Sequence, residues 1–353
     1  MRKSSVLISS ALAIIIPSAA ACARNGGAVP AAGAAAAAPQ AGAQQNRRFI
    51  PAEGADLKAR LDNAVKRGRS DARQTSFWTA YSFDVRPGVA VDIEVHHGDG
   101  IHFMDGVSVS LDSRAETRNV AVFLLHRAGQ EAVADVQIYN LERARDYRGH
   151  PVYWLGRAGN EESLNFLTKL AEAGTTGRIA ERAVMAVAIH DDARVPGVLK
   201  NLARNPSLGK ARAQAALWLG QFPEERAFLI ELARDERENT EVRKHAVLGL
   251  GMGKDSAALA ALRNVYDAVT NRQVKEHVFV AASSNENEDA AVDFLIGAAR
   301  KEPDRETRKQ AIFWLGQKAG ERSLIVLGEM AEASDGETEV QKQAVFALSQ
   351  KPR

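Results

Sequence analysis

The sequence predicts a mainly α-helical protein, in which an α-solenoid of about seven helix pairs follows a small antiparallel β module. Two observations lead to this prediction. A short pattern recurs every 31 to 33 residues over residues 148–353, and such a period is typical of stacked helical repeats. Between residues 77 and 141, apolar and polar residues alternate with a period of two, which is typical of strands that have one solvated face.

Residues 1–21 are predicted to be a secretory signal peptide. Arg2 and Lys3 form a charged start, and residues 6–16 form an apolar run that is too short to span a bilayer as a lasting helix. Pro17 and a series of small residues then provide a cleavage site. We therefore expect an exported protein that resides in the periplasm or is anchored to the membrane of a bacterium.

Cys22, the only cysteine of the chain, directly follows these small residues. Its placement resembles a bacterial lipoprotein signal, in which the cysteine becomes the acylated first residue, although Ala19 replaces the leucine that is usual three positions earlier. Ordinary cleavage nearby is the alternative, and a single cysteine excludes an intramolecular disulfide in either case. Residues 22–52 are rich in Ala, Gly, Pro and Gln and are predicted to be a disordered linker. Membrane contact is therefore expected only through a lipid anchor at Cys22.

The charge balance argues against a nucleic-acid partner. The chain has 46 basic and 44 acidic residues, and Arg2 and Lys3 are the only charged residues before Cys22. Removal of the signal thus leaves 44 basic and 44 acidic residues, whereas nucleic-acid binders usually have a clear basic excess. We expect a protein partner, whose identity the sequence does not disclose.

Residues 53–147 are predicted to form a short helix and the β module. Leu57, Leu61 and Val65 recur at helical spacing. Alternating runs bounded by turn residues then indicate about five mostly antiparallel strands. These predicted strands cover residues 77–85, 91–95, 107–111, 120–125 and 134–141.

The densest group of possible metal ligands lies between two of these strands, in the segment EVHHGDGIHFMDG that starts at Glu94 and ends just after Asp105. Imidazole and carboxylate groups at such short spacing are able to bind a divalent metal. The glycines of the segment favour a solvated hairpin loop, and neighbouring strand residues point to opposite faces. We therefore predict a loop and keep a metal site as the alternative. Its candidate ligands are His96, His97, Asp99 and His102.

The repeats align on one mostly aliphatic position, which we call the anchor. The anchors are Leu155, Val187, Leu219, Leu250, Ala282, Leu315 and Leu348. The residue after each anchor is small, which suits a helix C-terminus and lets neighbouring helices approach closely. Each unit is therefore predicted to contain a helix that ends near the anchor, a short turn and a second helix. No pair buries its apolar face alone, so stacking creates a continuous core.

The period, the helix–turn–helix order and the pattern A-x-x-x-L-G resemble HEAT repeats, specifically the short bacterial HEAT-like class. The resemblance covers residues 148–353 and implies a solenoid with an extended binding surface. Hydroxylases built on such repeats carry His-Glu dipeptides that bind iron, and this sequence contains no such dipeptide. Glycosylases of this fold act on DNA, and the predicted export of this chain argues against a DNA substrate. There is also no glycine-rich phosphate loop and no nucleophile elbow. We therefore predict no cofactor and no enzymatic activity.

Several side-chain columns of the repeat are candidates for binding a partner. The position seven residues before the anchor is basic in most repeats, and the position five residues before it is polar throughout. HEAT-like repeats commonly use the basic position to bond the loops of neighbouring repeats, so we favour a structural role there over a ridge for anionic partners. The polar position is predicted to line the binding surface. The partner-binding candidates from both columns are Arg212, Arg243, His245, Lys275, His277 and Arg308.

Three tryptophans, Trp154, Trp218 and Trp314, share the position before the anchor. Exposed indoles often anchor binding partners, but this spacing favours a place in the core between stacked repeats. The sequence as a whole predicts a non-enzymatic scaffold of the bacterial cell envelope that binds a protein partner on the solenoid surface. The alternative is an envelope enzyme or metal-binding module centred on the loop from His96 to Asp105.

Overall fold

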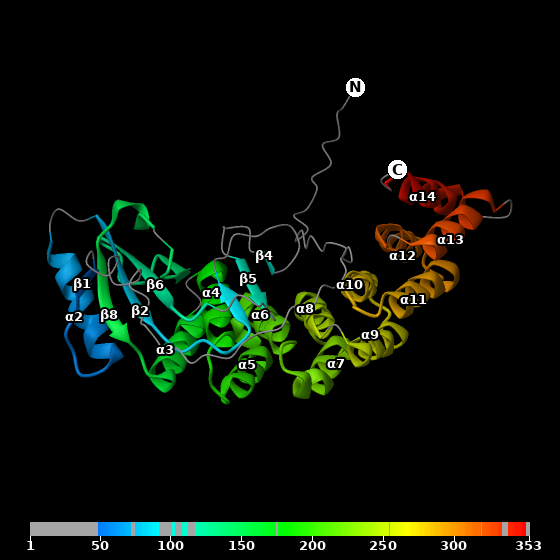
Figure 1. Ribbon diagram of the computed structural model, residues 1–353. Coiled ribbons are helices and arrows are strands. Elements are labelled where there is room, and N and C mark those ends of the chain that lie inside the picture. Colours follow the sequence, from blue (N-terminus) through cyan, green and yellow to red (C-terminus); the bar gives the residue numbers. More distant parts are fainter. Residues whose placement is uncertain are drawn as a thin grey trace, which may run out of the picture.

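The computed structural model describes residues 49–350, except 72–74, 92–100, 103–107, 112–116, 144, 174–175, 254, 319 and 334–337. The predicted signal peptide, Cys22 and most of the predicted linker lie outside the described residues. The described chain forms an elongated arc, with a β-sheet at one end and helix pairs in a row beyond it (Figure 1).

The sheet at the N-terminal end has five strands in the order β1-β8-β2-β6-β7. Strand β8 runs parallel to β1 and β2, whereas β2, β6 and β7 pair in antiparallel fashion. A smaller three-stranded antiparallel sheet has the order β3-β5-β4. The strands are β1 (Phe49–Pro51), β2 (Ser76–Ser82), β3 (Val89–Val91), β4 (Ile101–His102), β5 (Ser108–Leu111), β6 (Val120–Arg127), β7 (Asp135–Asn140) and β8 (Val152–Arg157). Helix α2 (Leu57–Ser70) packs against β2 and β8.

The prediction of an antiparallel β module is corrected to a mixed sheet. Phe49–Pro51, which falls within the predicted linker, is strand β1, and Val152–Arg157, which falls within the first predicted helical repeat, is strand β8. The segment VYWLGR matches the repeat pattern, but six residues are too few for a stable helix and suit a buried strand equally well. Leu155 is buried in the strand, as it would be in a stacked helix, so the anchor pattern does not distinguish the two.

Both faces of the five-stranded sheet are covered, which corrects the prediction of one solvated face. On one face, Phe77 and Tyr81 join the core that continues into the helices. On the other face, Trp78 and Phe123 belong to a second apolar cluster. Tyr147 covers that cluster, with its ring stacked 4.9 Å from that of Phe123 and its carbonyl accepting a hydrogen bond from Trp78 Nε1 at 3.0 Å. Residues of alternate positions in these strands therefore enter two different apolar cores, one on each face of the sheet.

Beyond the sheet, twelve helices form six pairs in the described residues. They are α3 (Asn160–Ala173), α4 (Gly177–Ala188), α5 (Val195–Arg204), α6 (Lys210–Leu219), α7 (Arg226–Arg234), α8 (Thr240–Met252), α9 (Ser256–Ala268), α10 (Arg272–Ser283), α11 (Glu288–Lys301), α12 (Arg305–Gln317), α13 (Glu321–Glu332) and α14 (Thr338–Ser349). Consecutive helices pack as pairs, α3 with α4, α5 with α6, and so on to α13 with α14, and successive second helices such as α6 and α8 also pack extensively. The anchor helix is therefore the second of each pair, and the predicted count of about seven units is not confirmed.

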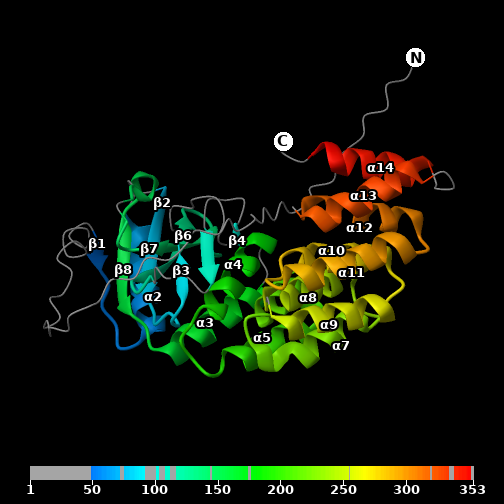
Figure 2. The same ribbon diagram turned by 45° about the vertical axis from the view of Figure 1, so that its right-hand side comes forward.

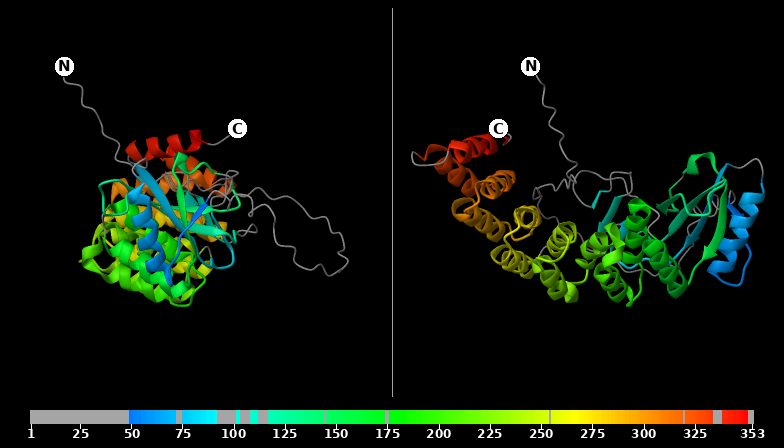
Figure 3. Two further views of the ribbon diagram at one scale, coloured as in Figure 1. Left: turned by 90° about the vertical axis from the view of Figure 1, so that its left-hand side faces the viewer. Right: turned by 180° about the vertical axis from the view of Figure 1, so that it is seen from behind.

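The anchor helices α4, α6, α8, α10, α12 and α14 form an inner layer on the concave side of the arc, and the other helices form an outer layer (Figures 1 and 3). Figure 2 shows the pairs stacked in sequence order from α3 to α14. Successive inner helices touch at the small residues of the repeat. A Cβ atom on Gly220 would lie 2.6 Å from Gly249 Cα, and one on Gly251 would lie 2.7 Å from Ala281 Cβ. The predicted reason for the small column, close helix approach, is thus confirmed.

The sheet and the helices share one core and a buried polar junction. Arg182 of α4 donates a hydrogen bond to the Val136 carbonyl of β7 at 3.0 Å. The Tyr81 hydroxyl of β2 lies 3.2 Å from the hydroxyl of Ser163, which in turn lies 2.7 Å from His190 Nε2. The sheet thereby covers the N-terminal end of the helix row. Among the described residues, the helices are too short or too polar to cross a membrane.

Candidate functional site

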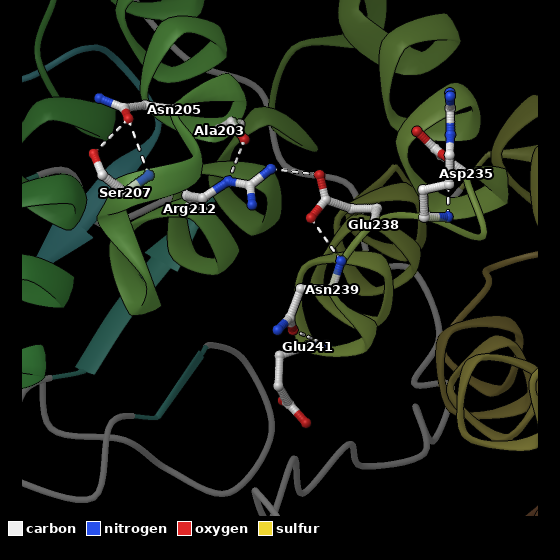
Figure 4. Close-up of polar contacts among 9 residues, drawn as sticks. Ala203, Asn205, Ser207, Arg212, Asp235, Glu238, Asn239 and Glu241 are labelled. Atoms are coloured by element: carbon white, nitrogen blue, oxygen red, sulfur yellow. Dashed lines mark hydrogen bonds and ion pairs between the residues drawn. The ribbon is translucent and has the colours of Figure 1, made fainter.

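The basic column of the repeat faces into the stack. Figure 4 shows Arg212 between the Ala203 carbonyl at the end of α5 and Glu238 in the connection before α8. Its Nε donates to that carbonyl at 3.0 Å, and its terminal nitrogen pairs with the Glu238 carboxylate. Glu238 also accepts from the backbone N–H of Asn239 at 2.6 Å. Because the last carbonyls of a helix lack partners within the helix, Arg212 satisfies one of them while joining two repeats.

Equivalent residues in other repeats act in the same way. Arg243 Nε donates to the Ala233 carbonyl at the end of α7 at 3.0 Å. Lys275 pairs at 3.0 Å with Glu302, the residue that caps α11. Arg243 is only 3% exposed, and the side chains of Arg212 and Lys275 are largely covered. These contacts support the structural interpretation of the column. Arg308 occupies the same position on α12 and is half-buried.

His245 and His277, the remaining partner-binding candidates, lie on the neighbouring inner helices α8 and α10. The Nδ1 atoms of the two rings are 2.8 Å from the carbonyl oxygens of Glu241 and Gln273, respectively, four residues earlier. A carbonyl only accepts, so Nδ1 carries the proton and Nε2 of the neutral ring is an acceptor. Burial lowers the pKa of both histidines, that of His277 to about 4 with a further contribution from Lys244. Both rings are therefore neutral at pH 7.

An apolar stripe runs along the inner layer beside these histidines. Residues two and five positions before the anchor lie on the side of an inner helix opposite its core residues, because 3.6 residues make one turn. The apolar stripe consists of Leu217, Leu248, Val280, Phe313 and Phe346, and the polar stripe of Gln214, His245, His277, Gln310 and Gln343. The apolar stripe is buried at α6 and α8, half-buried at α10 and α12, and 49% exposed at Phe346. It therefore becomes accessible toward the C-terminal pairs.

Charged residues next to the two stripes are paired within their own helices. The N–O distances of four such pairs range from 2.8 to 3.6 Å. The pairs are Lys244–Glu241, Arg272–Glu276, Lys309–Glu306 and Lys342–Glu339. These four pairs neutralise charge beside the two stripes.

Two groups of side chains could in principle carry chemistry: the predicted metal ligands and a Ser163–His190 pair. Of the metal candidates, His96, His97 and Asp99 lie outside the described residues, and only the backbone of His102 is described, in β4. The described part of the chain contains no group of three or more His, Cys, Asp or Glu side chains arranged to hold a metal. The Ser163–His190 pair was not anticipated from the sequence, because its members lie 27 residues apart on different elements.

The Ser163–His190 pair resembles a nucleophile and base only in its distance. Ser163 is fully buried and His190 is 1% exposed, so a substrate has no access to either. His190 Nδ1 bonds to the Ala186 carbonyl at 2.6 Å rather than to a carboxylate. Phe83 stacks on the His190 ring with centroids 4.0 Å apart. The pair therefore joins the sheet to the first helices.

The three tryptophans of the repeat pattern occupy different environments. Trp218 is fully buried in the main core, as the core interpretation predicts. Trp314 is half-buried against the same core. Trp154 lies on strand β8, half-buried, and its ring stacks on that of Phe49 at 5.4 Å. None of the three is among the large apolar side chains that are exposed in the described part of the chain.

Of three comparisons with known proteins, the one with family models agrees with this repeat architecture. No curated protein matches the chain significantly. A solved structure of human deoxyhypusine hydroxylase in complex with glycerol is similar at 18% identity and a TM-score of 0.30, over 53% of this chain and 72% of that one. A family model described as HEAT repeats matches residues 196–283, which extend from α5 to α10. The helix pairs of this segment therefore match HEAT repeats.

Proposed function

We propose that this chain is a non-enzymatic interaction scaffold that binds a polypeptide partner along its concave face. The main support is the apolar stripe, which is flanked by a stripe of neutral hydrogen-bonding side chains, one of each on every inner helix from α6 to α14. Solenoids offer such extended concave surfaces to partners. The N-terminal sequence supports a location in a bacterial cell envelope, in the periplasm or at a membrane through Cys22.

The two stripes recognise complementary parts of a polypeptide. Apolar side chains of the partner pack on Val280, Phe313 and Phe346, where the apolar stripe is accessible. Backbone amides of the partner donate to the acceptor nitrogens of His245 and His277, while the glutamines both donate and accept. Neighbouring packed helices lie about 8–10 Å apart, so the partner segment must be long enough to cross several repeats.

The proposal is tested by capture of the partner with the full mature chain from envelope extracts, followed by calorimetry with the purified partner. Val280→Asp and Phe313→Asp place a charge in the apolar stripe and are expected to weaken binding at least ten-fold. Ala227→Asp and Ala260→Asp are the controls, because these exposed alanines lie on the outer helices α7 and α9. Far-ultraviolet circular dichroism checks folding. Binding that survives both stripe variants and is lost in both controls would refute the concave site.

A further inference from the structure

The last helix pair carries an apolar patch on the outside of the molecule. In the described part of the chain, the exposed large apolar residues are all on α13 and α14. They are Leu324 (41% exposed), Ile325 (53%), Val345 (55%) and Phe346 (49%). In an antiparallel pair, residues equally far from the connection lie side by side. Residues 325 and 345 are equally far from the middle of the α13–α14 connection, so the four side chains lie at one level of the last pair, and we call these four residues the end patch.

The end patch continues an interface that exists between all earlier repeats. Val345 stands three residues before its anchor, and the residues at this position in the earlier inner helices are fully buried. They are Val184, Ala216, Val247, Phe279 and Ile312. Each inner helix packs against the inner helix of the next pair, so this position marks the face onto which another pair stacks. Val345 retains the apolar character of that face, whereas a terminal repeat usually has a polar outer face.

Two cations beside the end patch are paired within the chain. Arg322 pairs with Asp293 and, at 3.7 Å, with Asp289. Lys342 pairs with Glu339 at 2.9 Å. Two identical end patches therefore meet without a concentration of unpaired like charge. What remains at the contact is apolar surface, which favours burial.

Among the described residues, only the C-terminal helix pair presents such an exposed face. At the other end, the sheet covers α4, where Arg182 donates to the Val136 carbonyl and packs against β7. A chain with two complementary ends forms open filaments, whereas a chain that associates through one face pairs that face with itself and closes at two copies.

We propose that the end patch binds a second copy of this chain, so that the α13/α14 pairs of two copies stack about a two-fold axis. In this dimer two identical faces meet and bury apolar surface, whereas within the chain each such face packs on the opposite face of the next pair. Phe346 belongs to both the end patch and the apolar stripe, but Leu324 and Val345 lie outside both stripes, so variants at these two positions test the dimer separately from partner binding.

Sedimentation equilibrium of the purified full chain at several concentrations tests the dimer. We expect twice the mass of one copy at high concentration. Leu324→Glu and Val345→Glu bury a charge in the contact and are expected to raise the dissociation constant at least ten-fold. Ala260→Glu, on the exposed outer side of α9, is the control and should leave the dissociation constant unchanged. Circular dichroism establishes that the variants are folded.

Cross-linking supplies the second readout. In a Cys22→Ser background, Val345→Cys should give a covalent dimer with a flexible bismaleimide, and Ala260→Cys should not. A wild-type chain that is monomeric at all concentrations would overturn the proposal, and so would a dimer that withstands both glutamate variants. A third contrary result is a monomer in which the thiol introduced by Val345→Cys does not react with maleimide, because another part of the chain would then cover the end patch.

Discussion

Replacement of Gly220 by alanine tests the stacking of inner helices most directly. A Cβ atom at this position would overlap the Gly249 carbonyl oxygen and lie 2.5 Å from the carbonyl carbon. Because ordinary van der Waals contact begins at 3.4 Å, α6 and α8 must separate by about 0.9 Å or more, or shift along each other. Gly220 has φ −60°, so alanine adopts its backbone conformation without strain. The clash therefore makes the substitution destabilising. Overpacking of this kind costs about 1–3 kcal/mol, and we expect about 3 kcal/mol because backbone atoms cannot rotate away.

The matched control for this prediction is Gly297→Ala. Gly297 lies within α11, and nothing lies within 4 Å of a Cβ atom built there. Alanine in a helix interior is favoured over glycine by about 0.5–1 kcal/mol, so this variant should be slightly more stable. Urea denaturation measures both changes, and hydrogen exchange localises the loss in Gly220→Ala to α6 and α8, since repeat arrays often unfold in parts. A Gly220→Ala protein as stable as the wild type, with unchanged exchange, would show that close backbone contact is not the basis of stacking.

Three further predictions concern buried histidines, a buried arginine and the metal alternative. Burial lowers the pKa of His126 and His190 from 6.5 to about 4, so the unfolded chain takes up protons between pH 6.5 and pH 4 that the folded chain does not. The free energy of unfolding should therefore fall as pH decreases through this range, by about 3 kcal/mol per histidine at pH 4. Urea titrations at several pH values measure this profile, and His126→Gln should make its slope shallower. An unchanged slope in His126→Gln would contradict the prediction. Arg243→Ala removes the donor to the end of α7 and should lower the free energy of unfolding by about 2–3 kcal/mol, whereas Arg237→Ala, at an exposed position, should change it by less than about 0.5 kcal/mol. Elemental analysis of the purified full chain should find no stoichiometric divalent metal, and a bound ion that is lost in His97→Ala would establish the metal alternative instead.

The solenoid was predictable because its physical cause recurs in the sequence. Helices that stack in a row must present a small residue at each contact, as they do at Gly220, Gly251 and Gly316. Because this requirement recurs in every repeat, it appears in the sequence as a period. Strand β8 was missed for the same reason: its sequence satisfies the apolar pattern of the repeat. Its partners, β1 and β2, are about 70 to 100 residues away in sequence, and nothing local indicates that they pair with it.

The candidate site was predictable only in part. The position of His245 and His277 in one column follows from the period alone, and the structure places both on neighbouring inner helices. The role of Arg243 depends on whether its side chain points into the stack or out of it. A basic residue has the same letter in either case, and only its contact with the Ala233 carbonyl settles the matter. The Ser163–His190 pair left no local signal, since its partners belong to different elements.

The sequence by itself determined the helical repeat, its period and the small residues at helix contacts, because these depend on spacing along the chain. The tertiary structure decided which columns face inward, how the sheet covers one end and which apolar residues remain exposed at the other. These properties depend on what each surface meets, and a surface meets residues that are distant in the sequence. The end patch illustrates the difference: Val345 follows the same pattern as Ile312, but only Ile312 has another helix pair stacked on it.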